Sequence, residues 1–315
     1  MFKNYFITSV RNLWKDKLNT AINTIGLSVG IAACILILLF VQNELSFDKF
    51  HSKSDSIYRA WILEKYSNGN EFFNTITPFP LGDALATEVP EIEKVVQISI
   101  VNWKAVHGNK TYNENIHMVG TSFFEIFDFK IIRGSSGALL SDLNSMVITE
   151  PMAIKYFGST DVVGQTINFD LEEETKVFEI TAVVENPPTN SSINFDILIS
   201  DINKNSIFGS DVLENWFNIT AETYVLLSPG TNLESISDKL KAVSEKYVNL
   251  PSEEGVYNIG LQPLTDIHLN PDFPVGFALV SNPKYALILG TIALLILLIA
   301  CINFIMLSIS RSVGR

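Results

Sequence analysis

Two long runs without a charged residue constrain this chain more than any other feature of its sequence. The first runs from Ile25 to Val41 and the second from Tyr285 to Ile309. A helix needs about 20 mostly apolar residues to cross the hydrocarbon core of a bilayer, because each residue adds about 1.5 Å to its length. The second run is long enough, and so is the first when it is extended back to Ala21. The sequence therefore predicts transmembrane helices at 21–42 and 284–309.

A cleavable signal peptide is the alternative for the first run, because basic residues precede it. A signal peptide has a shorter apolar region, which starts within the first few residues and ends at a cleavage site between small residues. Here the apolar region begins near Ala21 and is followed by the polar sequence QNELSFD. We therefore interpret the first run as an anchor that is not cleaved.

The charges of the chain predict its orientation. The two ends together carry a net charge of +5, from Lys3, Arg11, Lys15, Asp16, Lys17, Arg311 and Arg315. Because the total is −12, residues 22–310 carry −17. Positive flanks of a transmembrane helix stay in the cytoplasm. We expect both termini inside, with Gln42–Lys284 on the outer side.

The two ends of the chain and its two cysteines are consistent with this topology. Residues 1–20 place apolar side chains on one helical face and basic ones elsewhere, as does a helix that lies in the membrane interface. Residues 310–315 form a short cytoplasmic end. Cys34 and Cys301 both fall within the predicted transmembrane helices, so the segment between them has no disulfide framework.

The segment between the helices predicts an α+β domain. Ser56–Tyr66 has the composition of a strand, a helix follows up to Pro90, and Val95–Ile100 is again a strand. A second β-α-β unit is predicted far downstream, from a strand at Thr223–Leu227, a helix at Leu233–Tyr247 and a strand at Tyr257–Leu264. Two such units around an unrelated middle predict a split β-α-β pair with an insertion.

The inserted middle is predicted to be mostly β structure. Its clearest part is a hairpin in which apolar residues alternate from Ile167 to Leu171 and again from Phe178 to Val184, with a tip that begins at Glu172. The three consecutive Glu residues at the tip are interpreted as a solvated turn, with a cation site as the alternative. The domain boundaries that we predict are 43–103 and 216–283 for the split pair and 104–215 for the insertion.

The sequence argues against catalysis and against nucleotide binding by this chain. A phosphate-binding loop needs Gly, four residues, Gly, Lys and Ser or Thr, whereas five residues separate Gly158 from Gly164 and Gln165 occupies the Lys position. We instead expect Gly158 to end a short helix and Gly164 to turn the chain into the hairpin. Ser46–Lys49 matches the Ser-x-x-Lys pattern of a serine–lysine dyad, but no second motif of such a hydrolase supports it.

Metal and nucleic acid sites are also not expected. The four histidines have no partner at the spacing of a zinc site, so we predict neither a metal nor a cofactor. The charge of −17 on the outer segment repels phosphate, which excludes nucleic acid as a partner.

Two groups of residues are candidates for a mechanical role. Gly26 and Gly30 are four residues apart and allow another helix to approach closely, and Asn303 is able to form a hydrogen bond within the membrane. Directly after the first helix, the sequence ELSFDKFH predicts a rigid joint in which apolar side chains pack while Glu44, Asp48 and Lys49 stay in water. The candidate joint residues are Glu44, Phe47, Asp48, Phe50 and His51. An ordinary packed helix end is the alternative.

Six stretches of the sequence resemble the MacB/FtsX-type ABC transporter permeases, most of all their Bacteroidetes branch. They lie at 11–60, 119–134, 146–167, 183–200, 261–269 and 299–312, and include VGTSFFEIFDFKIIRG, MVITEPMAIKYFGSTDVVGQTI and IACINFIMLSISRS. The resemblance implies a periplasmic core with a porter-like part, which corresponds to the split pair, and a β-rich sabre-like part, which corresponds to the insertion. It also implies a bacterial inner-membrane protein.

The resemblance implies a mechanism as well. A separate cytoplasmic ATPase hydrolyses ATP, and a pair of permease copies or paralogues converts this into movement of the periplasmic domains, for export or mechanotransmission. Family permeases continue through a coupling segment and two more helices, so we expect this sequence to be an amino-terminal portion or a half-unit. A periplasmic ligand-sensing receptor that lacks its output domain is the alternative function, because it has the same topology.

Overall fold

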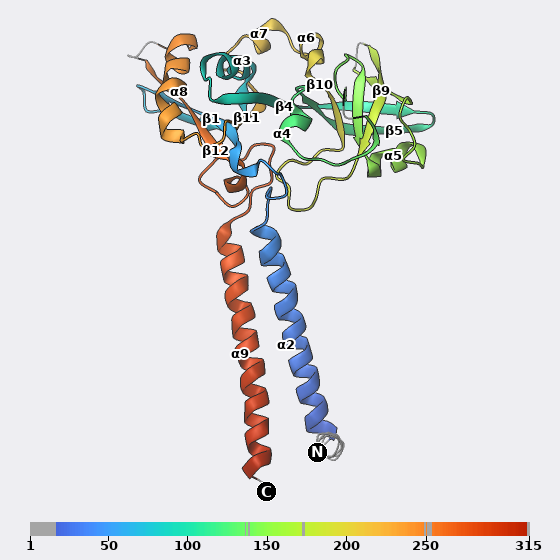
Figure 1. Ribbon diagram of the computed structural model, residues 1–315, viewed down its shortest axis with the longest axis vertical. Helices are drawn as coiled ribbons and strands as arrows, with labels where there is room; N and C mark the ends of the chain where they lie inside the picture. The colour runs from blue at the N-terminus through green and yellow to red at the C-terminus, as the bar shows by residue number, and fades with distance from the viewer. Residues whose placement is uncertain are drawn as a thin grey trace. The chain divides into compact units, whose positions relative to one another are not determined.

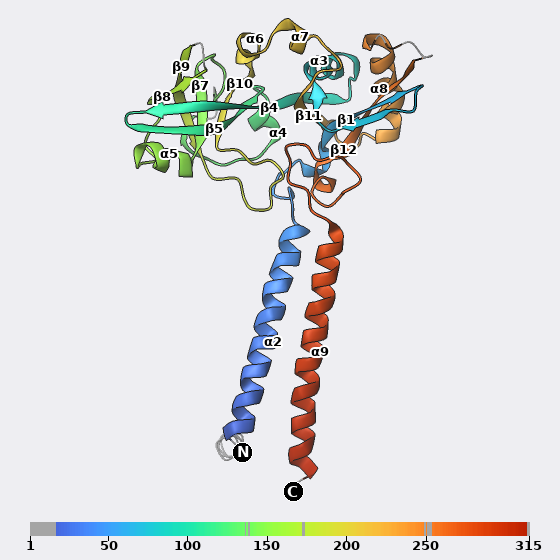
Figure 2. The same cartoon turned by 180° about the vertical axis from the view of Figure 1, so that it is seen from behind.

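The computed structural model describes residues 17–135, 137, 139–171, 174–248, 250 and 254–313, and the chain divides into two units. One unit comprises Met1–Ser46 and Asn282–Arg315, and we call its described part the helix pair. The other comprises Phe47–Ser281, and we call it the α/β unit. Figures 1 and 2 show the elements of each.

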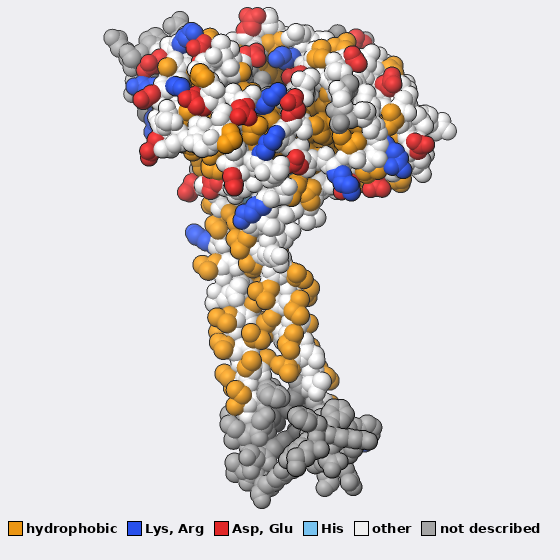
Figure 3. All heavy atoms as spheres, in the orientation of Figure 1, with side chains coloured by type: hydrophobic (Ala, Val, Ile, Leu, Met, Phe, Trp, Pro, Cys, Tyr) orange, Lys and Arg blue, Asp and Glu red, His pale blue; other side chains and the backbone are white. Residues whose placement is uncertain are grey.

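The helix pair consists of α2 (Lys17–Glu44) and α9 (Pro283–Val313), which pack side by side. Each contains a segment long and apolar enough to cross a membrane, at Thr20–Glu44 and at Pro283–Asn303. Hydrophobic side chains are the commonest coloured side chains on the described part of both helices (Figure 3), as is expected of helices that face lipid. The predicted interfacial helix at 1–20 lies mostly outside the described residues.

The α/β unit contains the strands β1 to β12 and the helices α3 to α8. Its strands are β1 Ile57–Tyr66, β2 Glu71–Asn74, β3 Thr77–Pro78, β4 Ile92–His107, β5 Lys110–Val119, β6 Ile131–Gly134, β7 Ser145–Thr149, β8 Thr166–Asp170, β9 Thr175–Val184, β10 Ile197–Ser200, β11 Ile219–Leu227 and β12 Gly255–Pro263. Its α-helices are α3 Phe79–Glu88, α4 Phe123–Ile126, α5 Glu150–Phe157, α6 Lys204–Ile207, α7 Ser210–Leu213 and α8 Leu233–Tyr247. Its short 3-10 turns are η1 Ser54–Ser56, η2 Asp201–Asn203 and η3 Leu264–Asp266.

The two predicted β-α-β units share one sheet. β1, α3 and β4 form the first, β11, α8 and β12 form the second, and the strands lie in the antiparallel order β12-β1-β11-β4. This order interleaves the two units, which is the arrangement of a split β-α-β pair. Helices α3 and α8 bury their apolar faces on the sheet, with Leu85, Ile236 and Leu240 in the shared core.

The middle of the chain extends the same sheet. From β4 the order continues through β5, β10, β7, β9 and β6, and β8 pairs with both β4 and β9. β4 is longer than the predicted strand at Val95–Ile100, because it continues past Lys104 and pairs along its whole second half with β5. The predicted boundary at 104 therefore falls within a continuous strand, and the division of the α/β unit into two parts remains a prediction.

Two glycines have the roles that the sequence predicts. Gly158 follows α5 with a φ of 74° and its N–H donates to the Ile154 carbonyl at 2.9 Å. Gly164 has a φ of 84°, its N–H donates to the Ile180 carbonyl at 2.8 Å, and it precedes the β8–β9 hairpin. Both need a backbone conformation that favours glycine. At the tip of the hairpin, Glu172 and Glu173 lie outside the described residues.

Candidate functional site

Two segments of the α/β unit connect directly to the helix pair, and both are held by buried contacts. We call Phe47–Lys53, which follows α2 in the chain, the entry segment. We call Ile267–Ser281, which precedes α9, the exit loop.

The entry segment is fixed to the rest of the unit through Asp48. Its N–H donates to the Asn190 carbonyl at 2.8 Å, and its Oδ1 accepts the Ser192 N–H at 2.7 Å. Asp48 has a φ of 59°, which makes it the single residue other than glycine with a positive φ in the described parts of the chain. This left-handed conformation is uncommon outside glycine, although Asn and Asp tolerate it best. The backbone of the joint is therefore set by a specific pairing with the 190–192 loop.

Asp48 is buried, and this changes its acidity. Loss of hydration raises the pKa of the Asp48 carboxyl to about 6, while the hydrogen bonds from Ser192 and the charge of His268 oppose this rise. Its Oδ2 atom has no hydrogen-bond partner among the described residues. Burial of the ionised carboxylate therefore costs hydration free energy that its hydrogen bonds only partly offset.

His51 holds the entry segment to the loop that follows α4. Its Nδ1 accepts the Asp128 N–H at 3.0 Å, and its ring lies against Phe50, Phe127 and Phe129. Burial lowers the pKa of His51 to about 4, with the Asp128 charge acting in the opposite direction. The imidazole is therefore neutral near pH 7, as its role as a hydrogen-bond acceptor requires.

Polar contacts on the surface continue this attachment. The Ser52 N–H and hydroxyl donate to Asp128 Oδ2 at 2.5 and 2.8 Å, and Lys53 Nζ donates to the Glu125 carbonyl at 2.7 Å. The segment from Asp48 to Lys53 is thus attached to two separate loops of the unit.

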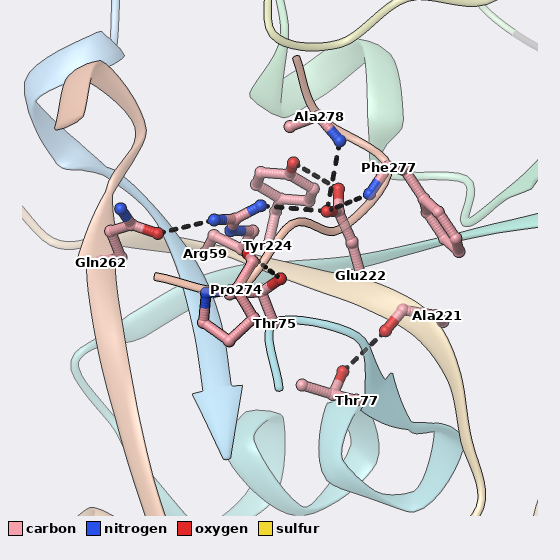
Figure 4. A network of polar contacts seen from close by, with 10 residues as sticks. All are labelled: Arg59, Thr75, Thr77, Ala221, Glu222, Tyr224, Gln262, Pro274, Phe277 and Ala278. Carbon is pink, nitrogen blue, oxygen red and sulfur yellow. Dashed lines mark hydrogen bonds and ion pairs between the residues drawn. The ribbon is translucent and has the colours of Figure 1, made fainter. Parts of the chain in front are cut away.

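The exit loop is held by a buried ion pair that the sequence analysis did not identify. Arg59 on β1 and Glu222 on β11 approach to 3.0 Å between Nη1 and Oε1, and both side chains are almost fully buried. Glu222 Oε1 also accepts the N–H of Phe277 at 2.8 Å, which attaches the loop to the sheet (Figure 4). Gly276 fits here because it has no side chain: a Cβ atom at this position would lie 2.2 Å from Glu222 Oε1.

Other buried groups complete the surroundings of this ion pair. Arg59 Nη2 donates to Gln262 Oε1 at 2.7 Å, and the Tyr224 hydroxyl donates to Glu222 Oε2 at 2.7 Å. Burial, with the neighbouring Glu222 charge, raises the pKa of Tyr224 well above its usual value. Thr75 Oγ1 donates to the Pro274 carbonyl at 3.2 Å. These hydrogen bonds and the ion pair therefore satisfy most of the polar atoms that folding has taken out of water, whereas Arg59 Nε has no hydrogen-bond partner among the described residues.

His268 connects the two segments. The Phe47 ring stacks on it with a centroid distance of 3.2 Å and an angle of 2°. His268 Nδ1 lies 3.0 Å from the Leu279 carbonyl, and the His268 carbonyl accepts the Ser281 N–H at 2.6 Å. The start of the entry segment and the end of the exit loop therefore contact the same residue.

The structure brings together four of the five predicted joint residues, Phe47, Asp48, Phe50 and His51. Glu44 is the last residue of α2. The prediction that Glu44 and Asp48 stay in water is wrong, because Glu44 is 8% and Asp48 0% exposed. For Asp48 the reason is that its left-handed backbone and its bond to Ser192 turn the carboxylate inwards. Leu45, predicted to pack, is exposed, whereas Lys49 is exposed as expected.

The three predicted packing residues of the helices have different surroundings. A Cβ atom on Gly30 would lie 3.2 Å from Ala300 Cβ, so Gly30 is at the contact between α2 and α9. Gly26 has nothing within 4 Å among the described atoms, and Asn303 is exposed. Nearby, Cys34 Sγ donates to the Ala293 carbonyl at 3.1 Å. Within the described parts of the chain, no three His, Cys, Asp or Glu side chains converge to hold a metal ion.

The sequence and the fold of this chain are similar to those of known proteins. The family model of the MacB-like periplasmic core domain matches residues 20–243. A solved domain of a protein described as a permease from Porphyromonas gingivalis is 23% identical, with a TM-score of 0.59 over 68% of this chain and 91% of that one. At this identity the likeness shows the fold alone.

Two further solved structures are more distant. The periplasmic region of MacB from Actinobacillus actinomycetemcomitans is 15% identical, with a TM-score of 0.45 over 68% of this chain and 90% of that one. The extracellular domain of the noncanonic ABC-type transporter YknZ from Gram-positive bacteria is 12% identical, with a TM-score of 0.45 over 64% of this chain and 98% of that one. A search of curated proteins gives no match.

Proposed function

The chain belongs to the MacB-like periplasmic core domain family, and from this premise we propose that it is a permease subunit that passes movement from its membrane helices to its α/β unit. A separate cytoplasmic ABC ATPase supplies the energy, and a second permease copy or paralogue completes the transporter. Both termini face the cytoplasm, and the α/β unit is in the periplasm. The charge distribution supports this orientation, since the basic residues are at the two ends of the chain.

One observation carries the mechanical part of the proposal. The entry segment and the exit loop are each attached to the α/β unit by buried contacts, and Phe47 of the entry segment stacks on His268 of the exit loop. A flexible linker would let a helix move without moving the domain, whereas a segment fixed by buried hydrogen bonds moves with it. Phe47, Asp48, Phe50 and His51 are therefore proposed as the joint on the side of α2, and Arg59 and Glu222 as its counterpart on the side of α9.

The packing of the helices has a part in the same proposal. Gly30 lets α2 approach α9 closely, because any side chain there meets Ala300. Such contact makes the two helices move together. Gly26 and Asn303 are proposed as contacts for helices of a further subunit.

The proposal assigns no catalysis to this chain. Gly158 and Gly164, the two glycines that most resemble a phosphate-binding loop, are used to end α5 and to enter the β8–β9 hairpin. An ATPase partner is therefore required for activity.

Reconstitution with the cognate ABC ATPase tests this function. In lipid nanodiscs the chain, joined to the coupling segment and the further helices that the family resemblance implies, should bind the ATPase and change its rate of ATP hydrolysis. A matched ATPase with its phosphate-loop Lys changed to Ala should bind without turnover. Replacement of Gly158 by Ala in the chain should leave the rate of ATP hydrolysis unchanged. Absence of binding, or ATP turnover by the isolated chain, would overturn the proposal. Stabilisation of the α/β unit by a small periplasmic ligand, without any response to the ATPase, would identify a receptor instead.

A further inference from the structure

The exit loop presents apolar side chains to the surroundings. From Phe273 to its end at Ser281 it has no charged residue. Val275 is 76% and Leu279 56% exposed, while Phe273 and Phe277 are half-buried. Scattered exposed apolar residues are ordinary, but several within one short loop mark a surface that contacts another apolar phase or partner.

The exposure of these side chains follows from the way in which the backbone is fixed. Glu222 accepts the Phe277 N–H, Thr75 donates to the Pro274 carbonyl, and the His268 ring lies within hydrogen-bond distance of the Leu279 carbonyl. Figure 4 shows the backbone nitrogen of Phe277 facing Glu222 while its ring points away from the ion pair. A loop that is attached on its polar side in this way holds its apolar side chains outwards.

The connection to α9 limits where this loop can lie. Leu279 is four residues before Pro283, the first residue of α9, so their Cα atoms are at most about 15 Å apart. The uncharged run of α9 begins at Tyr285. The covalent chain therefore holds Leu279 close to the level at which α9 enters the hydrocarbon.

The connection to α2 is equally short. α2 ends at Glu44, only three residues after Val41, the last residue of its apolar run. Phe47 is three residues further on and stacks on His268 of the exit loop. Neither helix therefore continues far beyond its apolar segment before the chain is attached to the α/β unit.

We propose that the exit loop is a lipid-contacting surface, in which Val275, Leu279 and the Phe277 ring enter the region between the headgroups and the acyl chains of the outer leaflet. The lipid bilayer is the proposed occupant because α9 follows the exit loop directly in the chain, and α2 and α9 are both long and apolar enough to cross one. Apolar and aromatic side chains favour this interfacial region. The inference rests on the two transmembrane helices and does not depend on an ATPase partner.

Lipid-quenching fluorescence tests this contact in the full chain. Cys34 and Cys301 are changed to Ala and Ser, and a nitrobenzoxadiazole label is attached to Val275→Cys or Leu279→Cys in nanodiscs of phosphatidylethanolamine and phosphatidylglycerol. Half of the lipids carry a nitroxide at carbon 5 of one acyl chain. Val256→Cys is the matched control, because Val256 is a 54% exposed valine at the start of β12, where it pairs with Lys65 of β1. Leu39→Cys in α2 is the positive control for insertion.

Quenching of the labels at positions 275 and 279 should be at least three times that at position 256 and should approach that at position 39. Equal quenching at 275, 279 and 256, with strong quenching at 39, would overturn the proposal, since the chain would be inserted while the loop stays in water. If the labels at positions 275 and 279 become shielded from water only at high protein-to-lipid ratios, and the nitroxide does not quench them, the proposal would also be overturned. The exit loop would then contact a second copy of the chain. Neither result depends on ATP, so failure here is distinct from failure of the proposed function.

Discussion

The entry segment and the exit loop perform the same structural task with different chemistry. The entry segment is attached by backbone pairing at Asp48, by a neutral His51 and by a ring stack on His268. The exit loop is attached to the carboxylate of Glu222, which Arg59 neutralises. The first attachment includes two groups with displaced pKa values, Asp48 at about 6 and His51 at about 4, whereas the second depends on a buried ion pair. Two connections in one domain therefore need not respond alike to pH or to mutation.

Breaking the ion pair is expected to have the largest effect. In Glu222→Gln the buried Arg59 keeps its charge without a counter-charge, and loss of one partner of a buried pair costs about 3–5 kcal/mol. Urea unfolding of the full chain in detergent, followed by Trp fluorescence, measures this. The matched control is Glu71→Gln, which breaks the exposed Lys65–Glu71 pair and should cost less than about 1 kcal/mol. Equal effects of the two changes would show that the ion pair does not hold the exit loop.

The pH dependence of the entry segment is expected to have the next largest effect, and two of its groups act in opposite directions. Because burial raises the pKa of Asp48 from 3.8 to about 6, its contribution to stability is fully present below pH 3.8 and is lost as the pH rises through 6. His51, whose pKa is lowered from 6.5 to about 4, behaves in the opposite way: its contribution is present above pH 6.5 and is lost as the pH falls through 4. The two contributions therefore oppose each other between pH 4 and 6.5.

Asp48→Asn removes one of these opposing contributions. Asn keeps an oxygen for the Ser192 N–H and tolerates the φ of 59°, so the variant should match the parent near pH 4 and exceed it near pH 7, by up to about 3 kcal/mol. Asp48→Ala should instead destabilise the protein at both pH values, because it loses the acceptor and the tolerance for this backbone. The free energy of unfolding of each variant is measured at pH 4 and pH 7. If Asp48→Asn changes this free energy by the same amount at both pH values, the Asp48 carboxyl does not titrate in this range.

Single hydrogen bonds give the smallest expected difference. Thr75→Val leaves the Pro274 carbonyl without its donor at a buried position of the exit loop, and should cost about 1–2 kcal/mol. Ser52→Ala removes a hydroxyl bond to Asp128 at the exposed edge of the entry segment, and should cost about 0.5 kcal/mol because water replaces the donor. A larger loss of stability in Ser52→Ala than in Thr75→Val would contradict the buried position of the Thr75 bond and the exposed position of the Ser52 bond.

Much of the fold was accessible from the sequence because its patterns are local. The helix at Leu233–Tyr247 has the predicted bounds, since its apolar stripe has a clear helical period. The β8–β9 hairpin and the roles of Gly158 and Gly164 follow from alternation and from turn chemistry over a few residues. β4 was underestimated because its second half, Val101–His107, mixes polar and apolar residues and is stabilised by pairing with β5.

The candidate site was less accessible because its contacts join distant parts of the chain. The position of the joint could be predicted from its place after the first helix, but the burial of Asp48 depends on Asn190 and Ser192, more than 140 residues away. The Arg59–Glu222 pair joins strands 163 residues apart. One sequence feature pointed to it: Arg59 lies among the apolar residues of β1 and Glu222 among those of β11, and opposite charges inside two buried strands indicate a buried pair.

The most direct test of the account is to interrupt one attachment and follow the α/β unit during ATP hydrolysis. A Gly-Ser pair inserted after Ser46 separates α2 from Phe47, whereas the same insertion after Asn68 lengthens only the exposed turn between β1 and β2. With the cognate ATPase in nanodiscs, a fluorophore on Asn109→Cys reports ATP-dependent movement of the α/β unit. We predict that the insertion after Ser46 abolishes this fluorescence change while ATP hydrolysis continues, and that the insertion after Asn68 leaves the fluorescence change intact. An unchanged fluorescence response after the Ser46 insertion would contradict the claim that the joint passes movement to the α/β unit.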